Sequence, residues 1–237
     1  MAVLIRQVSQ AARRAFIRLH DEKLVDYISA LEKLTEKLTA TDLGLNQDTI
    51  KQTRTFFGSQ APTSFISVEE NDNFTIGIFI VRNSSRIPLH DHPEMYGMVK
   101  VLMGSVAIKS FTPLPLEGHQ YVIPKEILSK IGTSQTPLLV PAKYDGTRVV
   151  TSDTNEVAIL DPSTNNLHEI EALNGTAAFV DILAPPYNQM NRDCRYYAML
   201  GTVHDKHHKM DISWLIETDN PAEFWTDSLP YQGPSPL

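Results

Sequence analysis

The clearest chemical signal is a pair of histidines in the segment PLHDHP, residues 88–93. The segment lies between two runs with the composition of β-strands, residues 74–82 and 97–104. On extended backbone, alternate side chains share one face, so His90 and His92 point the same way. Neutral imidazole binds iron, copper, nickel and zinc, and two imidazoles on one face supply half of a mononuclear metal site. The pattern alone is also typical of two exposed histidines in a turn.

A third metal ligand would come from a later strand, and the candidates are His119, His168, His204, His207 and His208. His168 lies in NLHEIEALNG, between apolar residues and turns, which is the setting expected of a ligand on a strand. His204, His207 and His208 have the i, i+3, i+4 spacing of a helical metal site, but DKHHKMD is strongly polar and predicts a solvated turn. His119 lies in a segment rich in proline and glycine, so we favour His168.

Composition limits the classes of protein to which this chain can belong. Its 237 residues are 42% hydrophobic and 21% charged, which is typical of a globular protein with one core. A net charge of −7 argues against nucleic-acid or membrane partners, and we expect a monomer. The single cysteine, Cys194, excludes an intramolecular disulfide and fits the cytoplasm. Residues 1–20 carry four arginines and no acid, so a mitochondrial transit peptide is the alternative to a helix packed on the domain.

The order of the predicted elements indicates an all-β body with a helical start. Apolar residues recur at three- and four-residue spacing over residues 22–38, which predicts a helix. A second helix, capped by Asn46 or Asp48, would end at Gly58. Beyond Pro62, about eight short β-rich runs are separated by Gly, Pro, Asn and Asp. Strands without intervening helices predict a sandwich, jelly roll or barrel.

These elements predict one domain in three parts. Residues 1–60 form a helical region packed on the barrel, residues 61–220 form the barrel, and residues 221–237 form an irregular C-terminal extension. The segment from Pro113 to Thr147 is rich in proline and glycine, so we expect a long surface excursion between strands there, and a candidate lid.

The spacing around the histidine pair resembles the first cupin motif. In that motif a strand, a tight turn and a second strand carry HxH, an acid and a glycine. Here His92 is followed by four residues and Gly97, then by six residues and Gly104. Gly97 stands where the acid is expected, so the resemblance implies a site of three histidines. The fold implied is the cupin double-stranded β-helix, a jelly-roll barrel.

Three blocks in order carry a wider resemblance: PLHDHPEMYGMVKVLMGSV, NLHEIEALNGTAAFVDILAPPY and RDCRYY. Together they resemble the thiol dioxygenase family that contains animal 2-aminoethanethiol (cysteamine) dioxygenase and the plant cysteine oxidases. The resemblance spans most of the chain, and DILAPPY and CRYY look closer to the animal branch.

The resemblance implies one Fe(II) held by His90, His92 and His168, with no carboxylate ligand. It also implies O2 as cosubstrate, with both oxygen atoms added to a thiol to give a sulfinic acid. The implied substrates are free cysteamine and proteins with an N-terminal cysteine. Oxidation of such proteins would mark them for oxygen-dependent degradation, which is an oxygen-sensing role.

Four further residues match positions of the same family. Asp181 and Tyr187, in DILAPPY, match positions lining the active site, where they would orient the substrate amine or the oxygen. Cys194 and Tyr196 match a pair that forms a thioether crosslink in some animal members. Asp181 is also a candidate acceptor for a histidine ring nitrogen that is not on the metal. The structural alternatives are an ordinary strand aspartate, a packed tyrosine and a buried free thiol.

Two other functions stay open at this point. One is a cupin metalloenzyme that acts on a non-thiol substrate, and the other is a non-catalytic cupin binding protein. The DILAPPY and RDCRYY blocks favour the thiol dioxygenase. Whether cysteamine or a protein N-terminus is the main substrate stays open.

Overall fold

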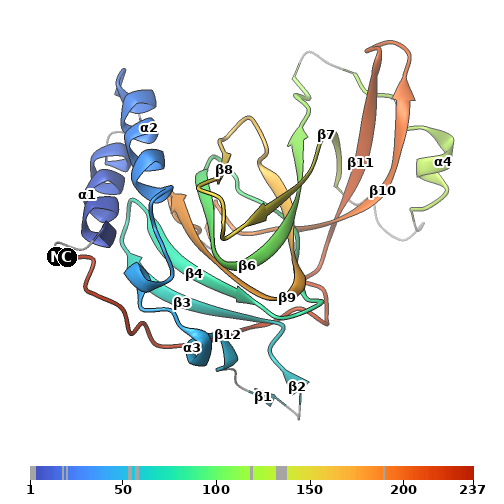
Figure 1. Ribbon diagram of the computed structural model, residues 1–237. Coiled ribbons are helices and arrows are strands. Elements are labelled where there is room, and N and C mark those ends of the chain that lie inside the picture. Colours follow the sequence, from blue (N-terminus) through green and yellow to red (C-terminus); the bar gives the residue numbers. More distant parts are fainter. Residues whose placement is uncertain are drawn as a thin grey trace.

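The computed structural model describes residues 4–17, 19, 21–52, 55–56, 59–117, 120–131, 138–188 and 190–237. A helical start precedes a body of strands (Figure 1). The helices are α1 (Leu4–Phe16), α2 (Leu24–Thr35), the 3-10 helix η1 (Thr41–Leu43), α3 (Gln47–Lys51) and α4 (Lys125–Leu128). The strands are β1 (Thr55–Phe56), β2 (Ser59–Gln60), β3 (Thr63–Glu70), β4 (Thr75–Val81), β5 (Arg86–Asp91), β6 (Tyr96–Pro113), β7 (Leu139–Thr151), β8 (Val157–Leu160), β9 (Leu167–Ala184), β10 (Tyr196–Asp205), β11 (Met210–Thr218) and β12 (Thr226–Ser228).

Six strands close into an antiparallel barrel. Their order is β9-β5-β10-β11-β7-β6, and the ring closes because β6 pairs with β9 as well as with β7. Strands β12, β3 and β4 extend the sheet beyond β9, and β8 extends it beyond β6. Strands β6 and β9 curve together along the lower side of the barrel in Figure 1. The prediction of an all-β jelly-roll barrel with N-terminal helices is confirmed.

Two long strands, β6 and β9, bend and so shape the barrel. The sequence predicts two short strands in place of each, because a glycine interrupts both. Register shifts accompany the bend at Gly104, which has a φ of 73° and where a Cβ would lie 2.8 Å from the carbonyl oxygen of Thr176. Because of the bend, Val99 and Ser110, from the two halves of β6, line one cavity together with His168.

Helix α1 packs its apolar side against the outer face of the sheet. One buried cluster joins this helix to β3, β4 and β9, and it includes Ile5, Val8, Ala12, Phe16, Ile66, Ile78 and Val180. A second cluster fills the barrel, and it includes Val99, Val106, Ile170, Ala177 and Phe179. The two faces of the sheet therefore bury two separate cores, and the basic N-terminal helix belongs to the outer one.

The helix that the sequence predicts up to Gly58 corresponds to α3, and α3 is shorter than predicted. Asn46 caps α3, because its side-chain oxygen accepts hydrogen bonds from the backbone N–H groups of Asp48 and Thr49 at 2.9 and 2.8 Å. The helix ends at Lys51, since the β-branched and aromatic residues beyond it favour strand β1. Gly58, the predicted end, lies outside the described residues.

The predicted excursion from Pro113 to Thr147 is also shorter. Strand β7 begins at Leu139 and pairs there with β11, a strand that has no counterpart among the predicted runs. Because β11 provides this pairing, residues from Leu139 onward form a strand where a loop was predicted. Helix α4 lies within the remaining part, and His119 falls outside the described residues.

The C-terminal segment is not wholly irregular. Strand β12 adds to the edge of the sheet in parallel with β3, with Thr226 opposite Thr63. Beyond β12 the chain runs back toward α1, where Arg6 donates to the carbonyl oxygen of Ser235 at 3.1 Å. Across the described ranges, every helix is too short or too polar to span a lipid bilayer.

Gly104→Ala is expected to lower the free energy of unfolding by roughly 2–4 kcal/mol, because the new Cβ must displace backbone at Thr176 in addition to the cost of a positive φ. The matched control is Gly146→Ala, where φ is 108° but a Cβ meets nothing within 4 Å. Urea unfolding followed by circular dichroism measures both. The packing argument fails if Gly104→Ala is no less stable than the control.

Candidate metal centre

Three histidines from two strands and one turn converge inside the barrel. His90 lies on β5 directly opposite His168 of β9, and His92 comes directly after the end of β5. Their ligand atoms all lie within 4.8 Å of one another, and their exposed fractions are 8%, 1% and 5% in the order His90, His92, His168. The predicted alternation of side chains therefore places the His90 and His92 rings together. The favoured third histidine joins them.

The histidine group contains no carboxylate within the described part of the chain. At Gly97, where a cupin acid is expected, an added Cβ would lie 2.8 Å from Cγ of Leu160. A longer side chain there would have to displace the packed Leu160 side chain. The donor set that results is three imidazoles, which suits iron, copper, nickel or zinc.

Backbone carbonyls set the orientation of two of the rings. The Nδ1 atom of His90 lies 2.8 Å from the carbonyl oxygen of Pro88, and Nδ1 of His92 lies 2.9 Å from that of Asn166. A carbonyl oxygen only accepts, so Nδ1–H donates and Nε2 carries the free lone pair. Asp181 was the predicted acceptor for such a nitrogen. For these two rings that prediction is wrong, because nearer backbone oxygens take the role.

Burial keeps all three imidazoles neutral. It lowers the pKa of His90 and lowers the pKa values of His92 and His168 well below the usual range. The other histidines of the cluster lower the pKa values of His92 and His168 further. Neutral rings are the form that binds a metal, so the site needs no proton release before an ion enters.

Asn166 is a positioning residue that the sequence does not reveal. Its side-chain nitrogen donates to the carbonyl oxygens of His92 at 2.8 Å and Asp161 at 3.0 Å, and its side-chain oxygen accepts from the backbone N–H of His92 at 3.3 Å. Asn166, the residue before β9, thus binds both the backbone and the ring of His92. The only sequence signal was an Asn pair in the turn before His168.

Asp91, between the two histidines, points to the opposite side and ties β5 to the segment before β10. Its carboxylate accepts from the backbone N–H of Arg195 at 2.9 Å and from the hydroxyl of Tyr197 at 2.9 Å. Nε of Arg195 lies 3.0 Å from the same carboxylate. This buried network fixes the strand that presents His90, although its partners lie far away in sequence.

Asp181 lies on β9 opposite Gly77 of β4 and Val99 of β6. It is 7% exposed, and its Oδ1 has no hydrogen-bond partner among the residues that the structure describes. Burial raises the pKa of this carboxyl to about 7. A cation or a hydrogen-bond donor brought to such a buried carboxyl group stabilises it as the anion.

Tyr187 lies beside His92, and Cys194 lies beside Tyr187. The Tyr187 hydroxyl donates to the carbonyl oxygen of Asp91 at 2.6 Å, and its ring centroid is 5.8 Å from that of His92. Burial raises the pKa of Tyr187 well above its usual value and that of the Cys194 thiol to about 12, so both keep their protons at neutral pH. The thiol lies within hydrogen-bonding reach of the hydroxyls of Tyr187 and Tyr196.

The remaining described histidines after β9 lie elsewhere. His204 and His208 belong to the β10–β11 hairpin, where their Nδ1 atoms lie 2.8 Å from Oδ1 of Asp211 and 3.2 Å from Oδ1 of Asp205, respectively. His207 lies in the same turn. The polar hairpin therefore agrees with the predicted solvated turn.

Two cavities adjoin the histidine cluster. One of about 310 Å³ includes His168 in its wall, and one of about 410 Å³ includes Asp181 and Tyr187. Both are of a size that holds a small ligand. His168 is therefore in direct contact with one cavity, and the other is bordered by two of the predicted site residues.

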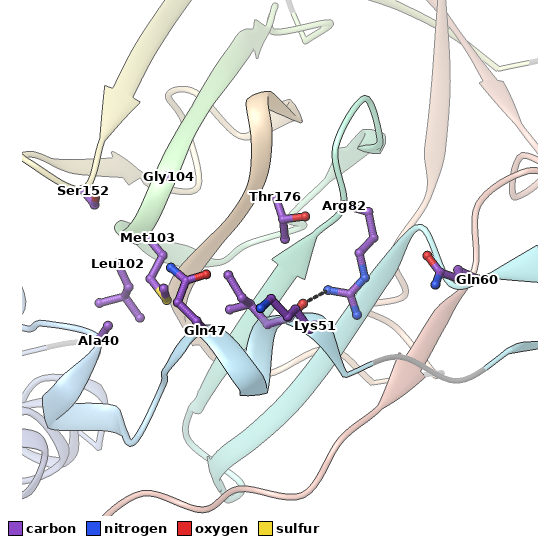
Figure 2. Close-up of a pocket in the computed structure, with 11 residues that line it drawn as sticks. Ala40, Gln47, Lys51, Gln60, Arg82, Leu102, Met103, Gly104, Ser152 and Thr176 are labelled. Atoms are coloured by element: carbon purple, nitrogen blue, oxygen red, sulfur yellow. Dashed lines mark hydrogen bonds between the residues drawn. The ribbon is translucent and has the colours of Figure 1, made fainter.

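A larger cavity, of about 820 Å³, lies at the bend of β6, between α3 and Gly104 (Figure 2). Arg82 reaches toward α3 there and donates to the carbonyl oxygen of Ile50 at 2.9 Å. The described lining of this cavity contains no His, Cys, Asp or Glu. Size alone therefore does not mark the functional site, and the chemistry belongs with the histidines.

Asn166→Ala is expected to weaken divalent-metal affinity by about 10- to 100-fold without abolishing it, because the His92 backbone loses its amide partner while the three rings remain. Asn155→Ala, at an exposed turn, is the control. Titration with Co(II) against a competing chelator measures both. Equal affinity in the two variants would show that Asn166 does not position the ring.

Asp181 makes stability depend on pH. Its pKa rises from 3.8 to about 7 on folding, so between these values the folded protein holds a proton that the unfolded chain has released. Stability therefore falls as pH rises, by about 2 kcal/mol between pH 5.5 and pH 8. Asp181→Asn should remove this part of the pH dependence in metal-free protein, as measured by urea unfolding at both pH values. Exposed Asp153→Asn is the control; identical behaviour of the two variants would refute the assignment.

Comparison with known proteins places this arrangement in a family. The chain matches the PCO_ADO family model over residues 34–235. It is 34% identical to 2-aminoethanethiol dioxygenase of Homo sapiens over 225 residues, covering 87% of this chain and 80% of that protein. It is 28% identical to plant cysteine oxidase 1 of Arabidopsis thaliana over 226 residues, covering 88% and 71%. A solved cupin superfamily protein from Desulfitobacterium hafniense matches with a TM-score of 0.33 and 10% identity, covering 52% of this chain and 76% of that one. On its sequence matches, the chain belongs to the PCO_ADO family, together with 2-aminoethanethiol dioxygenase and plant cysteine oxidase.

Proposed function

We propose that this chain is an iron-dependent thiol dioxygenase that converts cysteamine, the N-terminal cysteine of proteins, or both, to the sulfinic acid. The observation that carries the proposal is the buried group of three neutral histidines without a carboxylate, in a chain of this family. In the reaction both atoms of O2 end on sulfur, which gives up four electrons to the oxygen. No other reductant is needed.

The donor set fits Fe(II). His90, His92 and His168 would hold the ion through three neutral nitrogens and leave its charge uncompensated, which favours binding of the substrate sulfur as a thiolate. When bound, Fe(II) would supply the open positions at which the thiolate and O2 meet. The part of the protein is to keep the rings neutral, oriented and shielded from water by their burial.

Asp181 is proposed to bind the substrate amine. Cysteamine and an N-terminal cysteine share one unit, a thiol and an amine on adjacent carbons, so one site serves both. An ammonium group would give the buried Oδ1 of Asp181 its missing partner and stabilise the carboxylate. The Tyr187 hydroxyl donates to the Asp91 carbonyl oxygen, which fixes the ring beside His92. There the ring would form one wall of the substrate site and orient the substrate.

A thioether between Cys194 and Tyr196 is part of the proposal. Its formation joins sulfur to a ring carbon with loss of two hydrogens, and O2 would accept the two electrons. The contact between the thiol and the Tyr196 hydroxyl supports the pairing. Loss of two hydrogens from the peptide that carries both residues would reveal it.

The cellular setting proposed rests on charge and cysteine content. We propose a cytoplasmic monomer, with the mitochondrion as the alternative, that binds neither nucleic acid nor membrane. If proteins with N-terminal cysteine are substrates, its dependence on O2 gives it an oxygen-sensing role.

The test is mass spectrometry of products after aerobic incubation of Fe(II)-loaded protein with cysteamine or with a peptide that begins in cysteine. We expect a gain of two oxygen atoms on the thiol. His168→Ala should lower both iron affinity and turnover by at least about 100-fold, since it removes a ligand. His204→Ala, at a side chain that is 61% exposed, should match the wild type.

Two outcomes would contradict the proposal in different ways. Iron bound with no oxygen gained on either thiol would favour a cupin metalloenzyme with a non-thiol substrate. No iron bound in the wild type would favour a non-catalytic binding protein.

A further inference from the structure

An apolar cavity of about 410 Å³ extends from the proposed amine site over strands β9, β4 and β3. Its wall includes Phe65 of β3, Phe79 of β4 and Leu183 of β9, and its end near the histidines includes Asp181 and Tyr187. The cavity belongs to the range that holds sizeable ligands, and cysteamine is too small to need it. Its position beside Asp181 and Tyr187 therefore suits a larger group attached to the same thiol and amine unit.

Two aromatic rings give the cavity its apolar character. The rings of Phe65 and Phe79 lie 5.0 Å apart and are only half-buried, whereas Phe179 beside Phe79 is 1% exposed. The Phe65 ring lies over Gly77, which is paired in register with Asp181. Gly77 thus makes room for an apolar wall immediately beside the carboxyl group.

The cavity and the metal centre share one boundary. The Tyr187 ring lies 5.8 Å from the His92 ring and also lines the cavity. With its sulfur at the histidines and its amine at Asp181, an N-terminal cysteine has only its carbonyl free to continue the chain. The next Cα lies about 3.8 Å from that of the cysteine, so the second residue follows directly on the group bound at Asp181, which lines this cavity.

We propose that this cavity binds the side chain of the residue after an N-terminal cysteine and selects apolar side chains there. The inference rests on the thiol dioxygenase activity proposed above. Exposed Glu70, which also lines the cavity, opposes an acidic second residue by like charge. The aromatic wall opposes any charged side chain by desolvation. Phe65 and Phe79 are therefore specificity-determining residues for peptides and do not contact cysteamine.

The experiment compares peptides that begin in cysteine and differ only in the second residue, which is Leu, Asn, Asp or Lys. Leu, Asn and Asp are close in shape, so the series isolates polarity and charge. With Fe(II)-loaded wild-type protein, kcat/KM normalised to the cysteamine rate should be at least about tenfold higher for Leu than for Asn or Asp. Lys should also fall below Leu.

A variant tests the wall directly. Phe65→Lys should reduce the Leu-to-Asp preference at least about tenfold, because it replaces an apolar surface by a cation. Val149→Lys, at an exposed β7 side chain, is the matched control and should keep the preference. If Phe65→Lys does not fold, the wild-type peptide series still decides.

The outcomes separate this inference from the proposed function. Equal rates for all four peptides, or a preference for Lys, with cysteamine oxidised normally, would overturn the side-chain pocket and leave the dioxygenase standing. If no thiol is oxidised, anaerobic calorimetric titration of the same peptides into Fe(II)-loaded protein still ranks their affinities. A flat ranking there would overturn the pocket without reference to turnover.

Discussion

The register between β5 and β9 is the constraint on which the site depends. It places His90 opposite His168, and a slip by one residue would turn one of the two side chains to the other face of the sheet. Buried polar contacts from outside the pair hold this register. Asn166 binds the backbone of His92, and Asp91 binds the segment that leads into β10. Residues that touch no substrate therefore determine whether three imidazoles converge.

Burial has the same kind of effect on the histidines as on Asp181, Tyr187 and Cys194. It lowers the pKa values of the histidines and raises those of Asp181, Tyr187 and Cys194, so burial favours the uncharged form of each group. In the proposed function, charges enter this interior in opposite pairs, the thiolate with the metal ion and the ammonium with the carboxylate. Paired entry avoids leaving a single charge desolvated.

Sequence patterns predicted the parts of the site that depend on short-range geometry. Alternation along a strand was enough to place His90 and His92 on one face, and strand context was enough to favour His168. The bends of β6 and β9 were not predictable in this way, because Gly104 looks like the end of one strand and the start of another. The role of Asp91 was hidden for a different reason: its partners, Arg195 and Tyr197, lie in a block that only the folded chain brings near.

Two glycines inside strands show how the backbone sets the chemistry. Glycine weakens a strand and leaves room for close approach. At Gly97 that room is filled by Leu160, and the histidine group contains no carboxylate within the described residues, so a metal ion held there would keep its full charge for the proposed substrate sulfur. At Gly77 the room is filled by the Phe65 ring, which brings an apolar surface beside Asp181. In the proposed function, the missing side chains thus separate two tasks on one barrel: a metal ion at the histidines would bind the thiol, and an apolar wall beyond the amine site would bind the next residue of a peptide.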